Sequence, residues 1–288
     1  SHCHLQFNGY NKNREEVIKR CQEIGMLLNI VGTQKETSKR AVELAESQEN
    51  FYATIGLHPI HLYPTQVDEE ESSFLSREEE FDKEYYKNLA RSKKVVAIGE
   101  CGIDLFHIPQ NLNFNEILAK QRQEFVKQIE LAEELDLALV IHTRNSNDQT
   151  LPNAYNEILK LVSSAGSIAD SFRKIRKVIH CWGGTPLQAK KFLDLGFYLG
   201  FTGIITFPAR KTDLKSTDDL LETVKLTPLD KILIETDAPY LAPQKYRGTQ
   251  NEPWMVEEVA KKIASLRGLS IHDILKITSK NFVDFFKI

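Results

Sequence analysis

Seven short apolar segments recur along the chain, each bounded by polar or turn-forming residues. They cover 26–33, 51–57, 95–100, 138–143, 177–182, 196–202 and 232–238. The tetrapeptide HCHL at residues 2–5 would be the tail of an eighth strand at the very start. Because the segments are continuous apolar runs rather than apolar–polar alternations, they are typical of a parallel sheet that is covered on both faces.

Segments with helical spacing of their apolar positions lie between the strands. They cover 13–24, 37–48, 81–92, 116–136, 154–163, 186–194, 218–225, 253–267 and 270–286. Eight strands alternating with helices predict an α/β protein, and more specifically a (β/α)₈ TIM barrel that spans residues 1–288 as one domain. An open doubly wound sheet is the alternative, but neither GxGxxG nor GxxxxGK[ST] follows any of the strands.

Composition limits the classes of partner. A net charge of −3 gives no general attraction to nucleic acid or to an anionic membrane, so any site for a polyanion must be local. Four cysteines without a CxxC pair suit a reducing cytoplasm, and no apolar run of about 18 residues predicts a membrane span. The acidic segment 68–82 (DEEESSFLSREEEFD) is expected to be a solvated insertion followed by the start of a helix.

Residues with metal-binding side chains stand at the ends of most predicted strands. They are His2, His4, His58, Glu100, His142, His180 and Asp237. In a TIM barrel, catalytic groups lie at the C-terminal ends of the strands. Side chains two residues apart on a strand share a face, so His2 and His4 can bind one ion while Cys3 points away. We therefore expect a metal site at this end of the barrel.

The expected ligand set is too large for a single ion. Imidazole and carboxylate ligands suit Zn²⁺, Mn²⁺ or Fe²⁺, and Mg²⁺ becomes more favourable as oxygen ligands increase. Four imidazoles and two carboxylates suffice for two divalent ions that share a carboxylate, an arrangement that many phosphate-ester hydrolases use. Glu100, on a central predicted strand, is the natural bridging ligand.

At these residues the sequence resembles the TatD family of metal-dependent deoxyribonucleases, which belongs to the amidohydrolase-type barrels. The resemblance spans essentially the whole chain. It rests on these motifs, in order: HCHL, GLHP (56–59), VVAIGECGID (95–104), VIHTR (140–144), VIHCWGG (178–184), GFYLGFTG (196–203), ETDAPYLAP (235–243) and RGTQNEP (247–253).

The resemblance implies two metal-binding groups that share one bridging carboxylate. The first group is His2, His4 and Asp237, the bridge is Glu100, and the second group is His142 and His180. It also implies hydrolysis of DNA phosphodiesters, often from the 3′ end, with Mg²⁺ or a similar ion. Three features depart from the family: its aspartate two positions before the first histidine would precede Ser1, HCWGG replaces the commoner HCFSG, and the loop TFPAR (206–210) differs.

Four polar residues have predicted roles around the metals. Asp237 orients the attacking water and takes its proton. His58 contacts a phosphate oxygen or the leaving group, or else stabilises the loop before Pro59. Arg144, two residues beyond His142, binds phosphate or forms a surface ion pair. Glu235 lies one layer below Asp237 and holds a ligand histidine.

Other residues near the strand ends leave two interpretations open. Four aromatic residues could stack unpaired bases or pack the core: Phe106, Trp182, Phe201 and Tyr240. Three cysteines that follow proposed ligands are interpreted as buried small hydrophobic residues rather than a thiolate site: Cys3, Cys101 and Cys181. Asn251 is expected to be a helix N-cap, with Pro253 in the first turn.

The predicted function is therefore a divalent-metal-dependent deoxyribonuclease, acting 3′–5′ on single strands, as a cytoplasmic monomer with DNA as its partner. A small-molecule amidohydrolase or lactonase is one alternative, although many dinuclear enzymes of that kind carry a bridging modified lysine where this chain has Glu100. An aminoacyl-tRNA ester deacylase is another. A metal-binding or nucleic-acid-binding protein without catalysis would lack some of the six ligands, and the sequence contains all of them.

Overall fold

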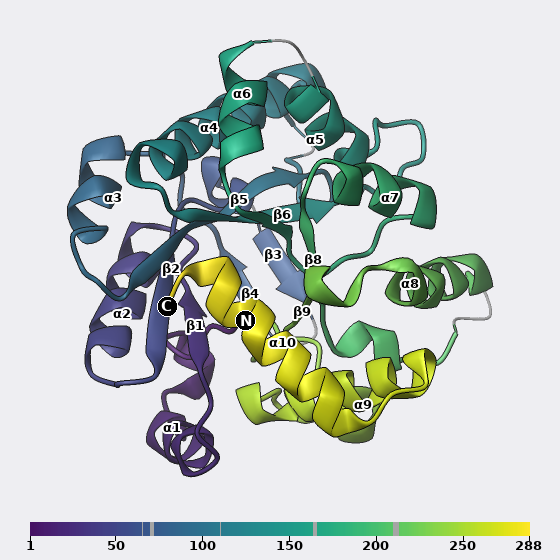
Figure 1. The fold of residues 1–288 in the computed structure, drawn as a ribbon. Helices are drawn as coiled ribbons and strands as arrows, with labels where there is room; N and C mark the ends of the chain where they lie inside the picture. Colours follow the sequence, from purple (N-terminus) through teal and green to yellow (C-terminus); the bar gives the residue numbers. More distant parts are fainter. Residues whose placement is uncertain (65, 70–71, 110, 164–165, 210–212) are drawn as a thin grey trace. The chain divides into compact units, whose positions relative to one another are not determined.

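The structure is a computed structural model that describes residues 1–64, 66–69, 72–109, 111–163, 166–209 and 213–288 (Figure 1). Side chains are described for these residues except 66–69 and 72–75. The chain divides into two compact units. The first unit combines Ser1–Ile30 with Val178–Ile288, and the second unit is Val31–Lys177. Both contain parallel strands with helices between them, so the predicted α/β class is confirmed.

The second unit alternates strands and helices along the chain. Its elements are α2 (Lys35–Glu46), β2 (Phe51–Ile55), the 3₁₀ helix η2 (Pro59–Leu62), β3 (Gln66–Glu69), β4 (Ser72–Leu75), α3 (Lys83–Leu89), β5 (Val95–Asp104), α4 (Phe114–Leu135), β6 (Ala138–Arg144), α5 (Ala154–Ser163) and α6 (Ser167–Lys174). At its two borders, β1 (Leu28–Val31) ends and β7 (Lys177–Ile179) begins.

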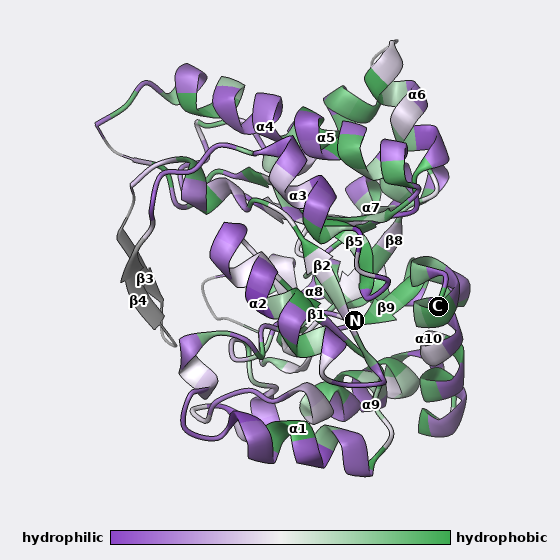
Figure 2. Cartoon of the chain, turned by 90° about the vertical axis from the view of Figure 1, so that its left-hand side faces the viewer, coloured by the Kyte–Doolittle hydropathy of each residue, from purple (hydrophilic) through white to green (hydrophobic). Residues whose placement is uncertain are grey.

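The core of the second unit lies between strands and amphipathic helices. β2, β5 and β6 pair in parallel in that order, and every residue of β5 is buried. Helix α2 packs against β2 and α4 packs against β5. Figure 2 shows hydrophobic and hydrophilic turns interleaved on α4, whose buried face includes Ile117, Phe125 and Ile129. The apolar stripe of the helix therefore covers the buried strand.

Two regions of the second unit differ from the sequence-based expectation. Within the acidic segment 68–82, β3 and β4 form an antiparallel pair before α3 begins at Lys83, whereas only a solvated insertion and a helix start were expected; residues 70 and 71 lie outside the described part. Helix α6 was not predicted, because an eight-residue helix is too short to show a sustained hydrophobic period.

The first unit holds the remaining elements. They are η1 (Asn8–Tyr10), α1 (Arg14–Glu23), α7 (Pro186–Asp194), β8 (Tyr198–Phe201), η3 (Gly203–Thr206), α8 (Leu214–Leu226), η4 (Leu229–Lys231), β9 (Ile232–Ile234), η5 (Gln244–Tyr246), η6 (Pro253–Met255), α9 (Val256–Arg267) and α10 (Ile271–Phe286). α10, yellow in Figure 1, packs against β9 and α9. None of the described helices combines the length and the apolar character that crossing a bilayer requires.

The N-terminal segment of the first unit behaves as the predicted strand tail, although only one residue pairs. β7, β8 and β9 are parallel neighbours, and Cys3 forms isolated parallel bridges with Ile30 on one side and Ala238 on the other. The backbone N–H of His4 donates to Ala238 O at 2.7 Å. These bonds place the side chains of His2 and His4 beside the loop that follows β9.

Most element boundaries lie close to the predicted ones, and the difference at β5 has a physical cause. The helices at 154–163 and 186–194 were predicted with the observed limits; for α7 the capping box of Thr185 and Gln188 marks the start. β5 instead continues past Glu100 to Asp104, with a register shift against β6 between Ile98 and Cys101. Glu100 therefore lies within a strand, and Asp104 occupies its end.

Candidate metal centre

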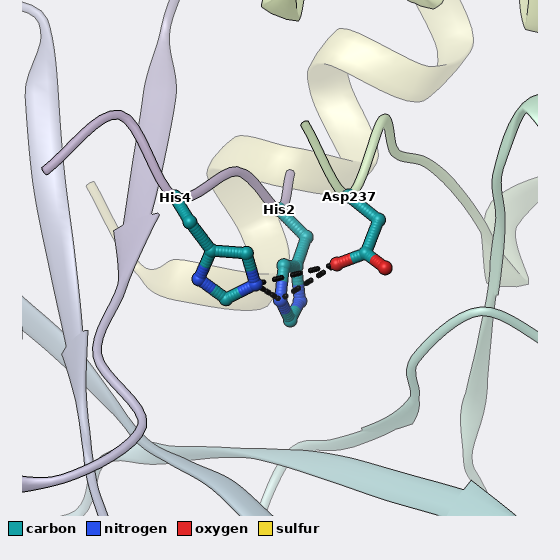
Figure 3. Close-up of side chains that lie close together, drawn as sticks. All are labelled: His2, His4 and Asp237. Carbon is teal, nitrogen blue, oxygen red and sulfur yellow. Dashed lines mark hydrogen bonds and ion pairs between the residues drawn. The ribbon is translucent and has the colours of Figure 1, made fainter. Parts of the chain in front are cut away.

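Three side chains converge in the first unit at the point where the N-terminal segment meets the loop after β9 (Figure 3). His4 Nε2 lies 3.3 Å from Asp237 Oδ1, and His2 Nε2 lies 3.6 Å from the same oxygen. The two Nε2 atoms are 3.3 Å apart. Both histidines are buried, so the nitrogens and the carboxylate oxygen face one another inside the protein.

His180, at the end of β7, completes this cluster. Its Nε2 lies 3.3 Å from Asp237 Oδ1, and its ring stacks on that of His2 with centroids 3.5 Å apart. Its Nδ1 shares a hydrogen bond of 2.7 Å with Glu235 Oε2. Glu235 Oε2 also accepts from the backbone N–H of Cys181 at 3.1 Å. The two hydrogen bonds fix the orientation of the His180 ring relative to the backbone of the next residue. Gly200 makes room for the Glu235 carboxylate, since a Cβ there would meet it.

The backbone fixes the direction of the Asp237 side chain. His2 O accepts from the N–H groups of both Thr236 and Asp237, at 3.3 and 3.1 Å. Asp237 itself has φ +58°, a left-handed conformation that is uncommon for a residue other than glycine. The regular strand therefore ends at Ile234, and the turn, rather than strand alternation, aims the carboxylate at the histidines.

The charge and spacing of this cluster fit a divalent cation. Burial alone would raise the pKa of Asp237, but the imidazoles of His180, His4 and His2 outweigh it and hold the pKa well below its usual range. Four tetrahedral ligand atoms at about 2.0–2.1 Å from an ion lie roughly 3.3 Å from one another. The ligand atoms of His2, His4 and Asp237 lie 3.3–3.6 Å from one another, which matches three corners of that arrangement, and imidazole nitrogen and carboxylate oxygen are donor types that suit Zn²⁺ or Mn²⁺.

Asn251 supports the Asp237 loop and is not the helix N-cap that the sequence suggested. Glu252 precedes η6, with Pro253 in its first position. The fully buried Asn251 side chain donates from Nδ2 to Thr236 O at 2.8 Å and to Tyr240 O at 2.6 Å. It therefore ties together the backbone on both sides of Asp237.

Asn251→Ala is expected to lower the free energy of unfolding by about 2–3 kcal/mol, because two buried carbonyl groups lose their donor. Urea denaturation measures this change. Asn13→Ala, which removes a hydrogen bond to Gln250 Oε1 nearer the surface, is the matched control and should cost about 1 kcal/mol or less. Equal losses in the two variants would contradict a bracing role for Asn251.

A second cluster forms at the ends of β5 and β6 in the second unit. His142 Nδ1 lies 3.0 Å from Glu100 Oε1, and its Nε2 lies 3.0 Å from Asp104 Oδ2. The same Asp104 oxygen lies 3.1 Å from His107 Nδ1, and Asp104 Oδ1 accepts from the backbone N–H groups of Phe106 and His107 at 2.8 Å. The His142 ring is therefore held between two carboxylates.

Asp104 and His107 are members of this cluster that sequence reasoning missed. The signal was present, because Asp104 ends the motif VVAIGECGID, but the strand was expected to stop at Glu100. Burial alone would lower the pKa of His142, yet its hydrogen bonds to Asp104 and Glu100 raise it to about 9. A metal ion that binds His142 Nδ1 at neutral pH must therefore displace a proton.

His58 faces the second cluster as a hydrogen-bond donor. The backbone N–H of Ile60 donates to His58 Nδ1 at 3.1 Å, so the neutral ring carries its proton on Nε2. That Nε2 lies 3.8 Å from Glu100 Oε1. Burial, together with the neighbouring His142, holds the pKa of His58 well below its ordinary value, so the ring is neutral. The structure thus shows both a loop contact through Nδ1 and a donor directed at the cluster.

The neighbouring His61 gives the second unit a predictable pH dependence. Burial lowers the pKa of His61 to about 4 from an ordinary 6.5, so acid favours the unfolded chain, which binds the proton first. Relative to acid pH, the free energy of unfolding is highest above pH 6.5. It falls as the pH drops towards 4, by up to roughly 3 kcal/mol from this histidine. Urea unfolding between pH 7 and 4.5 should show a shallower pH slope for His61→Phe than for wild type. His272→Gln, at an exposed position, should keep the wild-type slope, and equal slopes in all three proteins would contradict the prediction.

The other predicted residues are partly or fully buried. Arg144 ends β6, and its guanidinium carbon lies 4.0 Å from the centroid of the Phe106 ring. Cys3 and Cys101 are buried as expected, whereas Cys181 is only partly buried because its backbone, with φ +47°, departs from strand alternation. Burial raises the pKa of its thiol to about 12.

The structure therefore groups the predicted ligands within each unit. His2, His4, His180 and Asp237 lie together in the first unit, and Glu100 and His142 lie together in the second. The resemblance implies that His180 binds the same ion as His142, and this assignment stays a prediction; within the first unit, His180 Nε2 lies 3.3 Å from Asp237 Oδ1. Three histidine–carboxylate groups in the described residues have ligand atoms close enough to hold an ion, and each includes a predicted ligand.

Comparisons with known proteins identify the family of the chain. The family described as "TatD related DNase" matches residues 1–287. "Uncharacterized metal-dependent hydrolase YcfH" of Escherichia coli (strain K12) is 30% identical over 293 residues, covering 100% of this chain and 95% of the relative. "3'-5' ssDNA/RNA exonuclease TatD" of Erwinia tasmaniensis is 30% identical over 285 residues, covering 97% of this chain and 95% of the relative.

A solved structure supports the same relationship. The crystal structure of YJJV, a TatD homologue from Escherichia coli, has a TM-score of 0.74 and 27% identity, and the match covers 100% of this chain and 97% of that chain. The family match spans nearly every residue, and the two histidine–carboxylate clusters contain all six ligands that the family resemblance implies. The chain therefore belongs to the TatD related DNase family, a family of metal-dependent hydrolases.

Proposed function

We propose that the protein hydrolyses phosphodiester bonds of single-stranded DNA, from the 3′ end, with two divalent metal ions, Mg²⁺ in use and Zn²⁺ or Mn²⁺ as substitutes. The observation that carries the proposal is the convergence of His2, His4 and His180 on one oxygen of Asp237. The relative from Erwinia tasmaniensis that is named a 3′–5′ ssDNA/RNA exonuclease supports the choice of substrate.

As the family resemblance implies, His2, His4 and Asp237 would hold one ion, His142 and His180 would hold the second, and Glu100 would be the bridging ligand. When bound, divalent ions supply a nucleophile at neutral pH and offset the charge that develops on the phosphoryl oxygens. Glu235 would keep His180 oriented through Nδ1, leaving Nε2 as its ligand atom. Asp104 would do the same for His142 from its Nε2 side.

The chain's own groups carry the proton and phosphate contacts of the proposed reaction. Asp237, whose lowered pKa keeps it ionised, orients the attacking water and accepts its proton. His58 donates its Nε2–H to a phosphate oxygen or to the leaving oxygen. Arg144 supplies a guanidinium group with several N–H donors for the phosphate.

The remaining sequence predictions belong to the same proposal. We expect the strands to close as a (β/α)₈ barrel in a single domain of residues 1–288, and the likeness to the Escherichia coli TatD homologue supports this fold. A cytoplasmic monomer that acts on DNA without a membrane partner is the expected form.

End-labelled single-stranded DNA tests the proposal. Purified protein is incubated with 5′-labelled oligonucleotide under Mg²⁺, Mn²⁺ or Zn²⁺, beside Glu100→Ala. We expect a ladder that shortens from the 3′ end with at least one metal and little product from Glu100→Ala. Parallel assays with a lactone and with aminoacyl-tRNA cover the two other hydrolase classes. Cleavage of either, with intact DNA under every metal, would refute the nuclease assignment.

A further inference from the structure

One of the four aromatic residues near the strand ends is exposed beside the second cluster. Trp182 and Phe201 are fully buried and pack the core of the first unit. Phe106, in contrast, is 38% exposed, and it lies two residues after Asp104. Trp182 and Phe201 therefore pack the core, as one of the two interpretations has it. Phe106 exposes part of its ring to solvent, where a base can stack.

Contacts on several sides hold the Phe106 ring in place. The guanidinium carbon of Arg144 lies 4.0 Å from its centroid, which is close for a cation over an aromatic ring. The His107 ring meets it edge to face at 4.9 Å and 78°. The backbone N–H of Phe106 donates to Asp104 Oδ1 at 2.8 Å. An aromatic side chain that is already ordered binds a flat ligand at a lower entropic cost.

The same contacts place the ring next to the proposed chemistry. Asp104 binds the backbone of Phe106 with one carboxylate oxygen and the imidazole of His142 with the other. In the register of β5 and β6, Asp104 pairs with Arg144 and Gly102 pairs with His142. Arg144 thus lies two residues after the predicted ligand His142, and Phe106 lies two residues after Asp104, on the same two strand ends.

A ring and a guanidinium group provide the two contacts that one nucleotide requires. A guanidinium that stacks through its face directs its N–H groups within its own plane, away from the ring, where they can meet a phosphate. Aromatic faces stack on any of the four bases without selecting sequence. A base within a duplex has both faces covered by its neighbours, so such a ring favours an unpaired strand.

We propose that Phe106 and Arg144 form a nucleotide subsite, in which an unpaired base stacks on the Phe106–Arg144 pair and an adjacent phosphate binds the Arg144 guanidinium. The subsite rests on the proposed nuclease function and specifies its substrate as single-stranded nucleic acid. It assigns base contact and phosphate contact to different side chains, so the two can be separated by experiment.

Binding of two matched ligands tests the subsite without requiring catalysis. Labelled eight-nucleotide strands with phosphorothioate linkages resist hydrolysis, and one carries bases while the other is abasic throughout. Fluorescence anisotropy in Ca²⁺ gives the Kd of each for wild type, Phe106→Ala, Phe106→Trp and Arg144→Ala. Tyr52→Ala is the control. The Tyr52 ring also carries a cation, since Lys94 Nζ lies 5.2 Å from its centroid, but Tyr52 is at the N-terminal end of β2 rather than at a C-terminal strand end.

Wild type should bind the base-containing strand about tenfold more tightly than the abasic strand, since stacking of one base has roughly that effect. Phe106→Ala should bring this ratio close to one, while Phe106→Trp and Tyr52→Ala keep it. Arg144→Ala should weaken both strands by similar factors. A wild-type ratio near one, or an equal loss for both strands in Phe106→Ala, would overturn the subsite. Base discrimination without cleavage of any strand would instead refute the nuclease function alone.

Discussion

Asp237→Asn should abolish metal binding in the first unit and lower the rate of single-stranded DNA hydrolysis by at least about 10³-fold, equivalent to roughly 4 kcal/mol of transition-state stabilisation. Three imidazole nitrogens lie 3.3–3.6 Å from Asp237 Oδ1, so this oxygen is the shared anionic member of the cluster. An amide of the same size carries no charge and cannot accept a proton from water.

Both metal binding and DNA hydrolysis should decrease in Asp237→Asn, and each is measured separately. Mn²⁺ titration calorimetry gives the number of sites and their Kd values, and initial rates with labelled single-stranded DNA give the activity. Asp284→Asn is the control, because this carboxylate is on α10 in the same unit and forms an ion pair with Lys280 on the same helix. Retention of full metal stoichiometry by Asp237→Asn would contradict its assignment as a ligand, whatever happened to the rate.

The first cluster was largely predictable because it depends on short-range spacing. His2 and His4 share a face when the segment is extended, and the bridges of Cys3 to Ile30 and Ala238 keep it extended. Glu235 and Asp237 were separated into a supporting and a ligating residue by the same two-residue period. In the structure, a left-handed turn at Asp237, which follows the last strand residue Ile234, sets the direction of the Asp237 side chain.

The second cluster was less predictable because it depends on where a strand stops. Hydrophobic patterning suggested an end at Glu100, but pairing with β6 continues through Gly102 to Asp104. Gly102 has φ +142° and adjoins the carbonyl oxygen of His142, a close approach that no apolar period reveals. The side-chain amide of Gln121 on α4 then exchanges two hydrogen bonds with the Asp104 backbone. Such long-range contacts are not visible in a local window of sequence.

Each unit holds one imidazole between two carboxylates. In the first, His180 lies between Glu235 on Nδ1 and Asp237 on Nε2. In the second, His142 lies between Glu100 on Nδ1 and Asp104 on Nε2. A ligand histidine commonly uses one nitrogen for the metal and the other for a carboxylate that fixes its orientation. If Glu100 is the ligand, Asp104 must be the orienting group, and the ligating nitrogen differs between the two units.

This assignment predicts unequal effects for the two carboxylates around His142. Glu100→Gln should remove the metal of the second cluster and lower hydrolysis by about 10³-fold, as expected for loss of a charged ligand. Asp104→Asn should leave a complete ligand set and weaken metal binding by only about 10–100-fold, because the imidazole is less well oriented and less basic. Mn²⁺ titration of both variants measures the difference, with thermal unfolding as a check that each is folded. The opposite result, complete loss of the metal in Asp104→Asn with retention in Glu100→Gln, would reverse the two roles. The ion would then bind His142 through Nε2, the nitrogen that faces Asp104.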